Sequence, residues 1–199
     1  MDRFSRLCAL LAIVVSISSC LVKSIHPICS AQDSIMVPGL VGTWQDAKGE
    51  MTVIVSKSTG NTYRVVYLDK DNPSVFSGRV ARFGGKMFMD IIPVSIGWNN
   101  NLDNLSRLSA HMIFRLEQDR DRLSYSCLDI NWMKQALTSG TIKVAHEARV
   151  DENSPNVELI LTASTKDLGE FLSSVANNGN AFFKPVELMQ VKQQEHIKP

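Results

Sequence analysis

From Gly39 onward, short stretches of alternating apolar and polar residues are separated by turn-forming residues. A period of two is typical of a β-strand that buries one face. Five such stretches follow one another: Gly39–Gln45, Met51–Lys57, Thr62–Leu68, Val75–Phe83 and Lys86–Ile92. Gly84-Gly85 lies between the last two and is a strong signal for a two-residue hairpin. Strands joined by short turns predict an antiparallel meander.

Five further strands are predicted after residue 110: His111–Glu117, Leu123–Leu128, Thr141–Val150, Val157–Thr162 and Val186–Val191. Pro93–Ser109 precedes them and is the longest irregular segment of the chain. It contains Trp98 and an asparagine run. Loops of this length in a domain are often functional or mobile. We therefore consider Trp98 a candidate for a ligand entrance or a partner contact.

Two helices interrupt the later strands. Asp129 is placed to cap a short helix that runs to about Thr138, and Ser164 or Thr165 is placed to cap a second. In the second helix four apolar residues repeat at helical spacing: Leu168, Phe171, Leu172 and Val175. About nine strands with two short helices predict an all-β fold. The late strands and the amphipathic helix favour a closed antiparallel barrel with a helix packed against it.

The N-terminal segment has the pattern of an export signal. Arg3 and Arg6 precede the apolar run Leu7–Val15, and small residues follow. Ile17-Ser18-Ser19-Cys20 resembles the bacterial lipobox, an aliphatic residue and two small residues before a cysteine. That resemblance implies cleavage before Cys20 and lipidation of its thiol. Two or three acyl chains would anchor the protein stably, because each buried CH₂ contributes ~0.8 kcal/mol.

Two alternatives to lipidation stay open. An ordinary signal peptidase could cut after Cys29-Ser30-Ala31, or the apolar run could stay uncleaved as an anchor. On the lipidation hypothesis residues 1–19 are the signal peptide, residues 20–38 are a lipidated tether and residues 39–199 are the barrel domain. An acidic residue after the cysteine would suggest retention at the inner membrane. Leu21 stands there, which favours the periplasmic face of the outer membrane in a two-membrane bacterium.

Composition narrows the function classes. The 199 residues carry a formal net charge of +1, and 44% are hydrophobic. Removing the leader with its arginines leaves a mature chain near neutrality. Without a basic stripe, nucleic-acid binding is not expected. The chain is too apolar for a disordered protein, and the residues behind the leader suffice for one domain.

The candidate chemistry is sparse. His111 and His146 are the histidines of the predicted strands, and both could face a common interior. Paired with Asp90, Asp129 or Glu147, they would form an acid–base or metal site. A structural role in hydrogen bonding across the barrel fits them equally well. The spacing matches no metal motif, so no metal or cofactor is expected.

Cysteine chemistry is also unsupported by the pattern. Cys127 falls within a predicted strand, which argues against an accessible thiolate nucleophile. Its separation from Cys29 gives little support for a disulfide, although export would permit one. Because no nucleophile elbow or phosphate loop is present either, we expect a protein that is not an enzyme.

Gly42-Thr43-Trp44 at the start of the meander resembles the G-x-W motif of lipocalins and related calycin barrels. That resemblance implies that Trp44 packs across the closed end of a barrel. Trp132, on the first predicted helix, could plug a barrel end or contact a partner. A series of segments, taken in their order along the chain, resembles the sequences of an uncharacterised group of bacterial lipoproteins with a lipocalin-like domain. Its segments are Gly42–Trp44, Phe83–Asp90, His111–Phe114, Leu128–Met133 and Leu161–Thr165 with Phe171-Leu172.

Two functions are consistent with this sequence. The first is an envelope lipoprotein that holds a small apolar or amphipathic ligand, such as a fatty acid, in its barrel. The second is a non-catalytic structural or interaction lipoprotein that assists an envelope protein complex, with the barrel filled by its own side chains. In both cases the membrane is a partner through the N-terminal lipid.

Overall fold

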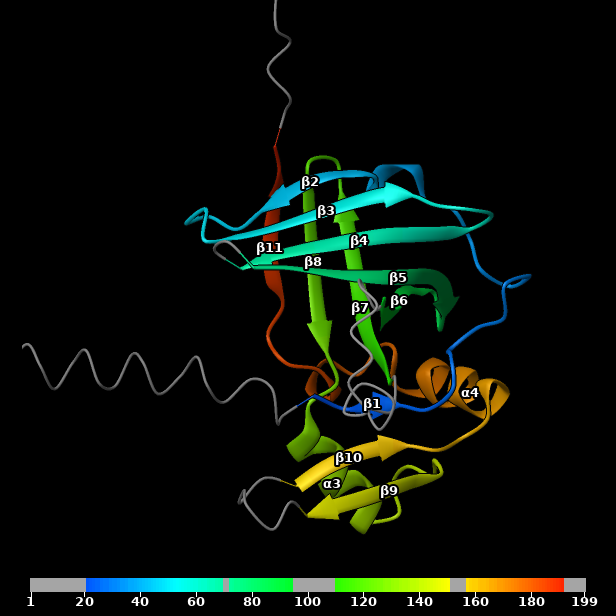
Figure 1. The fold of residues 1–199 in the computed structure, drawn as a ribbon. Coiled ribbons are helices and arrows are strands. Elements are labelled where there is room, and N and C mark those ends of the chain that lie inside the picture. Colours follow the sequence, from blue (N-terminus) through cyan, green and yellow to red (C-terminus); the bar gives the residue numbers. More distant parts are fainter. Residues whose placement is uncertain (1–20, 70–71, 95–109, 151–156, 192–199) are drawn as a thin grey trace, which may run out of the picture.

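A computed structural model describes residues 21–69, 72–94, 110–150 and 157–191. Eight antiparallel strands form a closed barrel in which each strand pairs with the next along the chain, and β6 pairs with β7. The last barrel strand pairs with both the seventh and the first, so the ring closes (Figure 1). The eight are β2 Gly42–Gln45, β3 Met51–Lys57, β4 Thr62–Asp69, β5 Asn72–Phe83, β6 Lys86–Pro93, β7 His111–Asp119, β8 Arg122–Cys127 and β11 Val186–Gln190.

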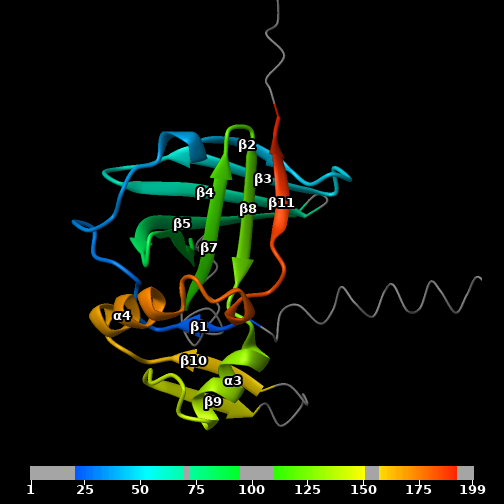
Figure 2. The ribbon, with the colours of Figure 1, turned by 180° about the vertical axis from the view of Figure 1, so that it is seen from behind.

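A second layer lies outside the barrel and comes mostly from the chain between β8 and β11. β1 (Lys23–Ser24) pairs with the first residues of β7, beyond the point where β8 ends. β10 (Val157–Leu161) runs parallel to β1, and β9 (His146–Val150) lies antiparallel to β10. The helices are α3 (Ile130–Thr138) and α4 (Thr165–Val175), with short 3-10 turns at η1 (Pro38–Leu40) and η2 (Gly179–Ala181). Figure 2 shows this layer gathered at one end of the barrel.

The predicted all-β antiparallel barrel with two short helices is confirmed. The strand number differs slightly, because three short strands lie outside the eight of the barrel. The hairpin between β5 and β6 turns at Gly84 and Gly85, whose φ angles are 55° and 81°. Both values lie in the left-handed region that glycine adopts without steric cost.

Both helices start at the predicted residues. The Asp129 carboxylate accepts hydrogen bonds from the backbone N–H groups of Asn131 and Trp132. Ser164 Oγ accepts the N–H of Asp167 at the start of α4. Each cap satisfies donors that the first helical turn leaves unpaired. All four of the apolar residues predicted for the second helix are buried: Leu168, Phe171, Leu172 and Val175.

Hydrophobic residues form two separate cores. The barrel core fills the inside and includes Trp44, Tyr63 and Leu188, all 0% exposed. The outer core lies between the outside of the barrel, β1, β10 and the two helices, and it includes Phe88 and Leu161. Alternate residues of β6 and β7 therefore belong to different cores. One face of each strand points into the barrel, and the other faces the helices.

The segment expected as a tether, residues 20–38, is part of the fold from Leu21 onward. Leu21 forms an isolated β-bridge with Asp129, and Val22 and Ile28 are each 1% exposed in the outer core. The boundary at residue 39 was therefore too late. A two-residue strand that pairs only with distant segments has no periodicity for sequence analysis to detect.

A second correction concerns the predicted strand Thr141–Val150. The strand begins only at His146. The backbone N–H of Ile142 donates to the carbonyl of Ala136 at the end of α3, at 3.2 Å, so the chain here wraps the helix terminus. Ile142 and Val144 alternate because they pack against the outer core.

Candidate functional site

The two ends of the barrel differ in how well their interior is covered. We call the end where β2, β4, β6 and β8 finish the mouth, and the opposite end the closed end. The register places the same alternate positions of each strand inside: Val55 pairs with Val65, and Met89 with Phe114. Exposure of these interior positions can therefore be followed along each strand from one end to the other.

The closed end is filled by large side chains. Trp44 is 0% exposed, and its Nε1–H donates to the carbonyl of Leu40, at 2.9 Å. Leu40 belongs to η1, directly before the first barrel strand. Tyr63, also 0% exposed, donates its hydroxyl hydrogen to the Val37 carbonyl and accepts the Val37 N–H. The segment before β2 thus covers this end, where Trp44 packs.

The mouth retains apolar surface that is only partly covered. Interior side chains change from buried to half-buried toward this end on several strands. Phe114 on β7 and Tyr125 on β8 are half-buried, whereas Leu116 and Leu123, next toward the closed end, are 5% exposed. Val186 on β11 is 38% exposed, although Leu188 is 0% exposed. The half-buried side chains of the mouth are Met51, Val53, Tyr67, Phe76, Met112, Phe114, Tyr125 and Cys127.

Two contacts join side chains of the mouth to one another. The rings of Phe114 and Tyr125 meet edge to face, with centroids 5.7 Å apart. The Tyr125 hydroxyl donates to Met51 Sδ at 3.5 Å. Burial, with smaller contributions from Cys127, Tyr67 and Asp46, raises the pKa of Tyr125 to about 12. This phenol is therefore neutral at physiological pH and offers a polar group beside an adaptable thioether.

Neither described cysteine is an activated thiol. Burial raises the pKa of Cys127 to about 11, and burial together with Asp90 raises that of Cys29 to about 11. Both thiols are free rather than joined in a disulfide. A nucleophilic cysteine needs its pKa lowered, so this geometry gives no support to a thiol mechanism.

These raised pKa values predict a loss of stability in alkali. The unfolded chain releases both thiol protons near pH 9, whereas the folded chain holds them to about pH 11. Stabilisation from this source is complete below the unfolded pKa and disappears as pH rises through that window. We expect urea midpoints to fall between pH 9 and 11. The fall should be less steep in the Cys29→Ala, Cys127→Ala double variant. Parallel curves for the two proteins would contradict the assignment.

His111 lies outside the barrel, opposite an aspartate. Its neighbours Met112 and Phe114 pack on the barrel core, while His111 Nδ1 lies 2.7 Å from Asp90 Oδ1. The Asp90 side chain is only 3% exposed. Its other oxygen accepts the backbone N–H of Ile28 at 3.1 Å. The pair therefore fastens the N-terminal segment to the outside of β6 and β7.

The expectation of a shared interior for His111 and His146 is wrong. The register runs from His111 to Ser24, Leu161 and then His146, so two strands lie between the histidines. At about 4.8 Å per strand their backbones lie roughly 14 Å apart. His146 is exposed, and its Nδ1 contacts the carbonyl of Val144 at 2.9 Å. Among the described residues, no three metal-binding side chains cluster.

The other candidate residues are separated as well. Trp132 lies on α3 and packs partly buried against the outer core, so it does not plug the barrel. Trp98 and Cys20 lie outside the described residues. Among the described helices, none has the length and hydropathy needed to cross a membrane.

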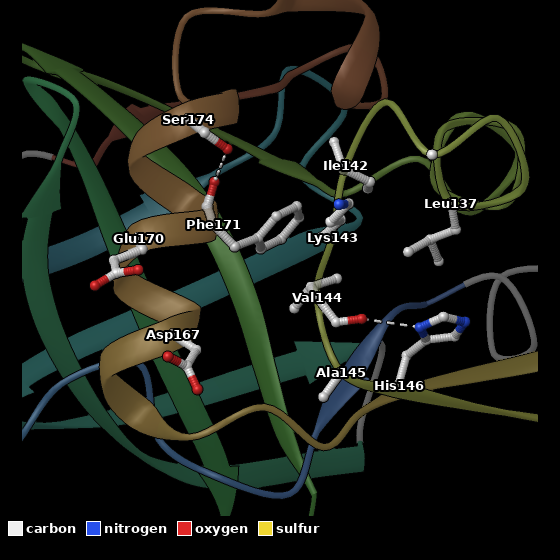
Figure 3. Close-up of a pocket in the computed structure, with 11 residues that line it drawn as sticks. Leu137, Ile142, Lys143, Val144, Ala145, His146, Asp167, Glu170, Phe171 and Ser174 are labelled. Carbon is white, nitrogen blue, oxygen red and sulfur yellow. Dashed lines mark hydrogen bonds between the residues drawn. The ribbon is translucent and has the colours of Figure 1, made fainter.

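A surface groove of about 660 Å³ lies between α4 and the chain that follows α3. Figure 3 shows Phe171 on α4 directed toward Ile142 and Val144, with Leu137 on the far side. Three charged residues, Lys143, Asp167 and Glu170, also line it, together with His146. This groove lies outside the barrel.

Sequence analysis missed the mouth, although alternation identifies which residues of each strand share a face. Which end of the barrel stays open depends on Leu40 and Trp44 closing the other one, and this is a property of the closed ring. The chain matches no protein family model, no curated protein and no solved structure.

Proposed function

We propose that this protein is a lipid-anchored lipoprotein of the bacterial envelope that binds a small apolar or amphipathic ligand through the mouth of a lipocalin-like barrel. The observation that carries the proposal is the gradient of exposure inside the barrel, from 0% at Leu188 to 38% at Val186. Half-buried aromatic and thioether side chains inside a barrel end are suited to an apolar ligand.

The chemistry of the mouth favours a chain-like ligand with a polar head. Methionines at 51 and 112 adapt their shape to a flexible apolar group. Tyr125 provides a neutral hydroxyl for one hydrogen bond. Covering the mouth side chains would remove apolar surface from water at about 25 cal/mol per Å². A fatty acid or a related lipid meets these requirements.

A charge placed in the mouth should weaken this binding strongly. Val186→Glu puts a carboxylate at an interior position that is already 38% exposed, so folding should survive. We expect at least about tenfold weaker binding of a fluorescent sixteen-carbon fatty acid, since tenfold corresponds to about 1.4 kcal/mol and an unpaired charge costs more than that in an apolar site.

The matched control is Val41→Glu, because Val41 is 40% exposed at the opposite end of the barrel. This variant should bind the fatty acid as the parent does. Binding by Val186→Glu that equals the control, or no binding by the parent protein, would reject the proposed ligand site. The anchor is tested separately, by measuring whether the mature N-terminal peptide carries the mass of acyl chains on Cys20.

A structural or interaction role is the second candidate, and the groove beside α4 favours it. β9 pairs with β10 alone among the described strands, so its other backbone edge is available to a partner strand. The groove and this edge adjoin at His146, the first residue of β9. Crosslinking from Glu147 to an envelope protein in intact cells would support this role.

A further inference from the structure

The N-terminal end of the described chain reaches the barrel at its mouth. Lys23 pairs with Met112, one of the mouth side chains, and Leu21 bridges Asp129, two residues after the last residue of β8. β8 finishes at the mouth, and Figures 1 and 2 both show β1 passing under this end of β7 and β8. Any anchor attached before Leu21 is therefore attached beside the mouth.

The segment from Leu21 to Ser24 is packed against the domain, so it cannot act as a flexible linker for an anchor attached before it. Val22 is 1% exposed and Ser24 is 0% exposed, and Lys23 forms an ion pair with Glu158 on β10. Three residues of extended chain span at most about 11 Å, and paired strands lie about 5 Å apart. An anchor attached three residues before Lys23 therefore has a reach of at most about 16 Å from the Cα atom of Met112. A free tether of the kind first expected would reach several times farther.

Apolar side chains also project around the mouth. Phe183 is 37% exposed, and its N–H donates to the carbonyl of Cys127, the last residue of β8, at 3.0 Å. Val186 follows on β11, and Val94 at the end of β6 is 44% exposed. Lys184 lies between Phe183 and Val186 and is exposed. Val41, Met189 and Val191, before β2 and at the far end of β11, are exposed to a similar extent. Exposed apolar surface alone therefore does not choose between the two ends, but Phe183 beside Lys184 gives the mouth an aromatic and a cationic side chain that suit the interface of a bilayer.

We infer that the mouth faces the membrane that holds the anchor, so that the ligand is the acyl chain of a bilayer lipid and enters the barrel directly from that membrane. The inference rests on the proposed function and adds the source of the ligand. Covalent attachment within about 16 Å keeps the mouth at the membrane surface, where the lipid is present at high effective concentration. The closed end, covered by Leu40 and Trp44, points away from the bilayer.

Depth-dependent quenching tests the orientation. The full lipidated protein is placed in vesicles of phosphatidylethanolamine and phosphatidylglycerol that contain lipids brominated on their acyl chains. A bimane fluorophore is attached at Phe183→Cys or at Val41→Cys, positions that are 37% and 40% exposed. Cys29 and Cys127 should label little, because Cys29 is buried, Cys127 is half-buried and the pKa of each is raised to about 11. The unsubstituted protein measures that background.

We expect quenching at Phe183→Cys to exceed that at Val41→Cys at least threefold. Equal quenching, or stronger quenching at Val41→Cys, overturns the orientation, and so does an N-terminal peptide without acyl mass on Cys20. If the fatty-acid titration succeeds in either case, the ligand site itself stands and only its source is rejected. If the parent protein binds no fatty acid, the ligand site fails and this inference fails with it, whatever the quenching.

Discussion

Replacing Asp90 with alanine is expected to lower the free energy of unfolding by about 2–6 kcal/mol, because two buried groups lose their hydrogen-bond partner and each such loss costs about 1–3 kcal/mol. Asp90 is 4% exposed and contacts both His111 and the backbone N–H of Ile28. The change would leave both groups without that acceptor. Urea unfolding measures the effect, and protection of the Ile28 amide from hydrogen exchange should fall with it.

The control for Asp90 is a carboxylate whose ion pair is exposed. Glu117 lies 3.2 Å from Lys86, and its side chain is 57% exposed. Glu117→Ala should cost less than about 1 kcal/mol, because solvent screens such pairs. A double-mutant cycle with His111→Ala separates the pair from the loss of the Ile28 contact. Equal costs for Asp90→Ala and Glu117→Ala would show that the buried pair does not hold the N-terminal segment.

Trp44→Ala is expected to cost about 3–5 kcal/mol, the range for removing a large aromatic side chain from a packed core. Trp44 is 0% exposed and also donates a hydrogen bond to Leu40. Because these residues close the barrel, the variant should also bind an environment-sensitive dye at the closed end. Urea unfolding and dye fluorescence check the two effects.

Trp132→Ala is the matched comparison for Trp44→Ala. Trp132 is partly exposed on α3 and packs against the outer core, so its removal should cost clearly less. Val186→Glu should leave dye binding at the closed end unchanged. If Trp44→Ala and Trp132→Ala destabilise the protein equally, then the closed end does not depend on Trp44.

Local chemistry made much of the fold predictable. Gly84-Gly85 specifies its own hairpin, and Asp129 and Ser164 cap their helices through contacts two or three residues away. β1 could not be predicted in this way. It consists of Lys23 and Ser24, and both partners lie on strands far along the chain. Its pairing depends on the finished barrel rather than on neighbouring residues.

The candidate site was less predictable, because a strand pattern does not state which face looks inward. His111 faces outward since Met112 and Phe114 take the interior. Asp90 was one of several acidic partners considered for it, and only the register of β6 against β7 selects that residue. The position of the mouth could not be predicted from strand patterns either, because the exposure of its side chains depends on how eight strands and η1 close the opposite end.

The closing strand has a consequence for how the chain reaches this fold. β11 is the last described strand, yet it pairs with β2, the first strand of the ring. Until it arrives, the edges of β2 and β8 carry unpaired backbone groups, and such edges invite pairing with other chains. A contact that joins the two ends of the domain is also slow to form. A chain that emerges from the ribosome starting at its N-terminus would therefore be most prone to aggregate just before its final strand emerges.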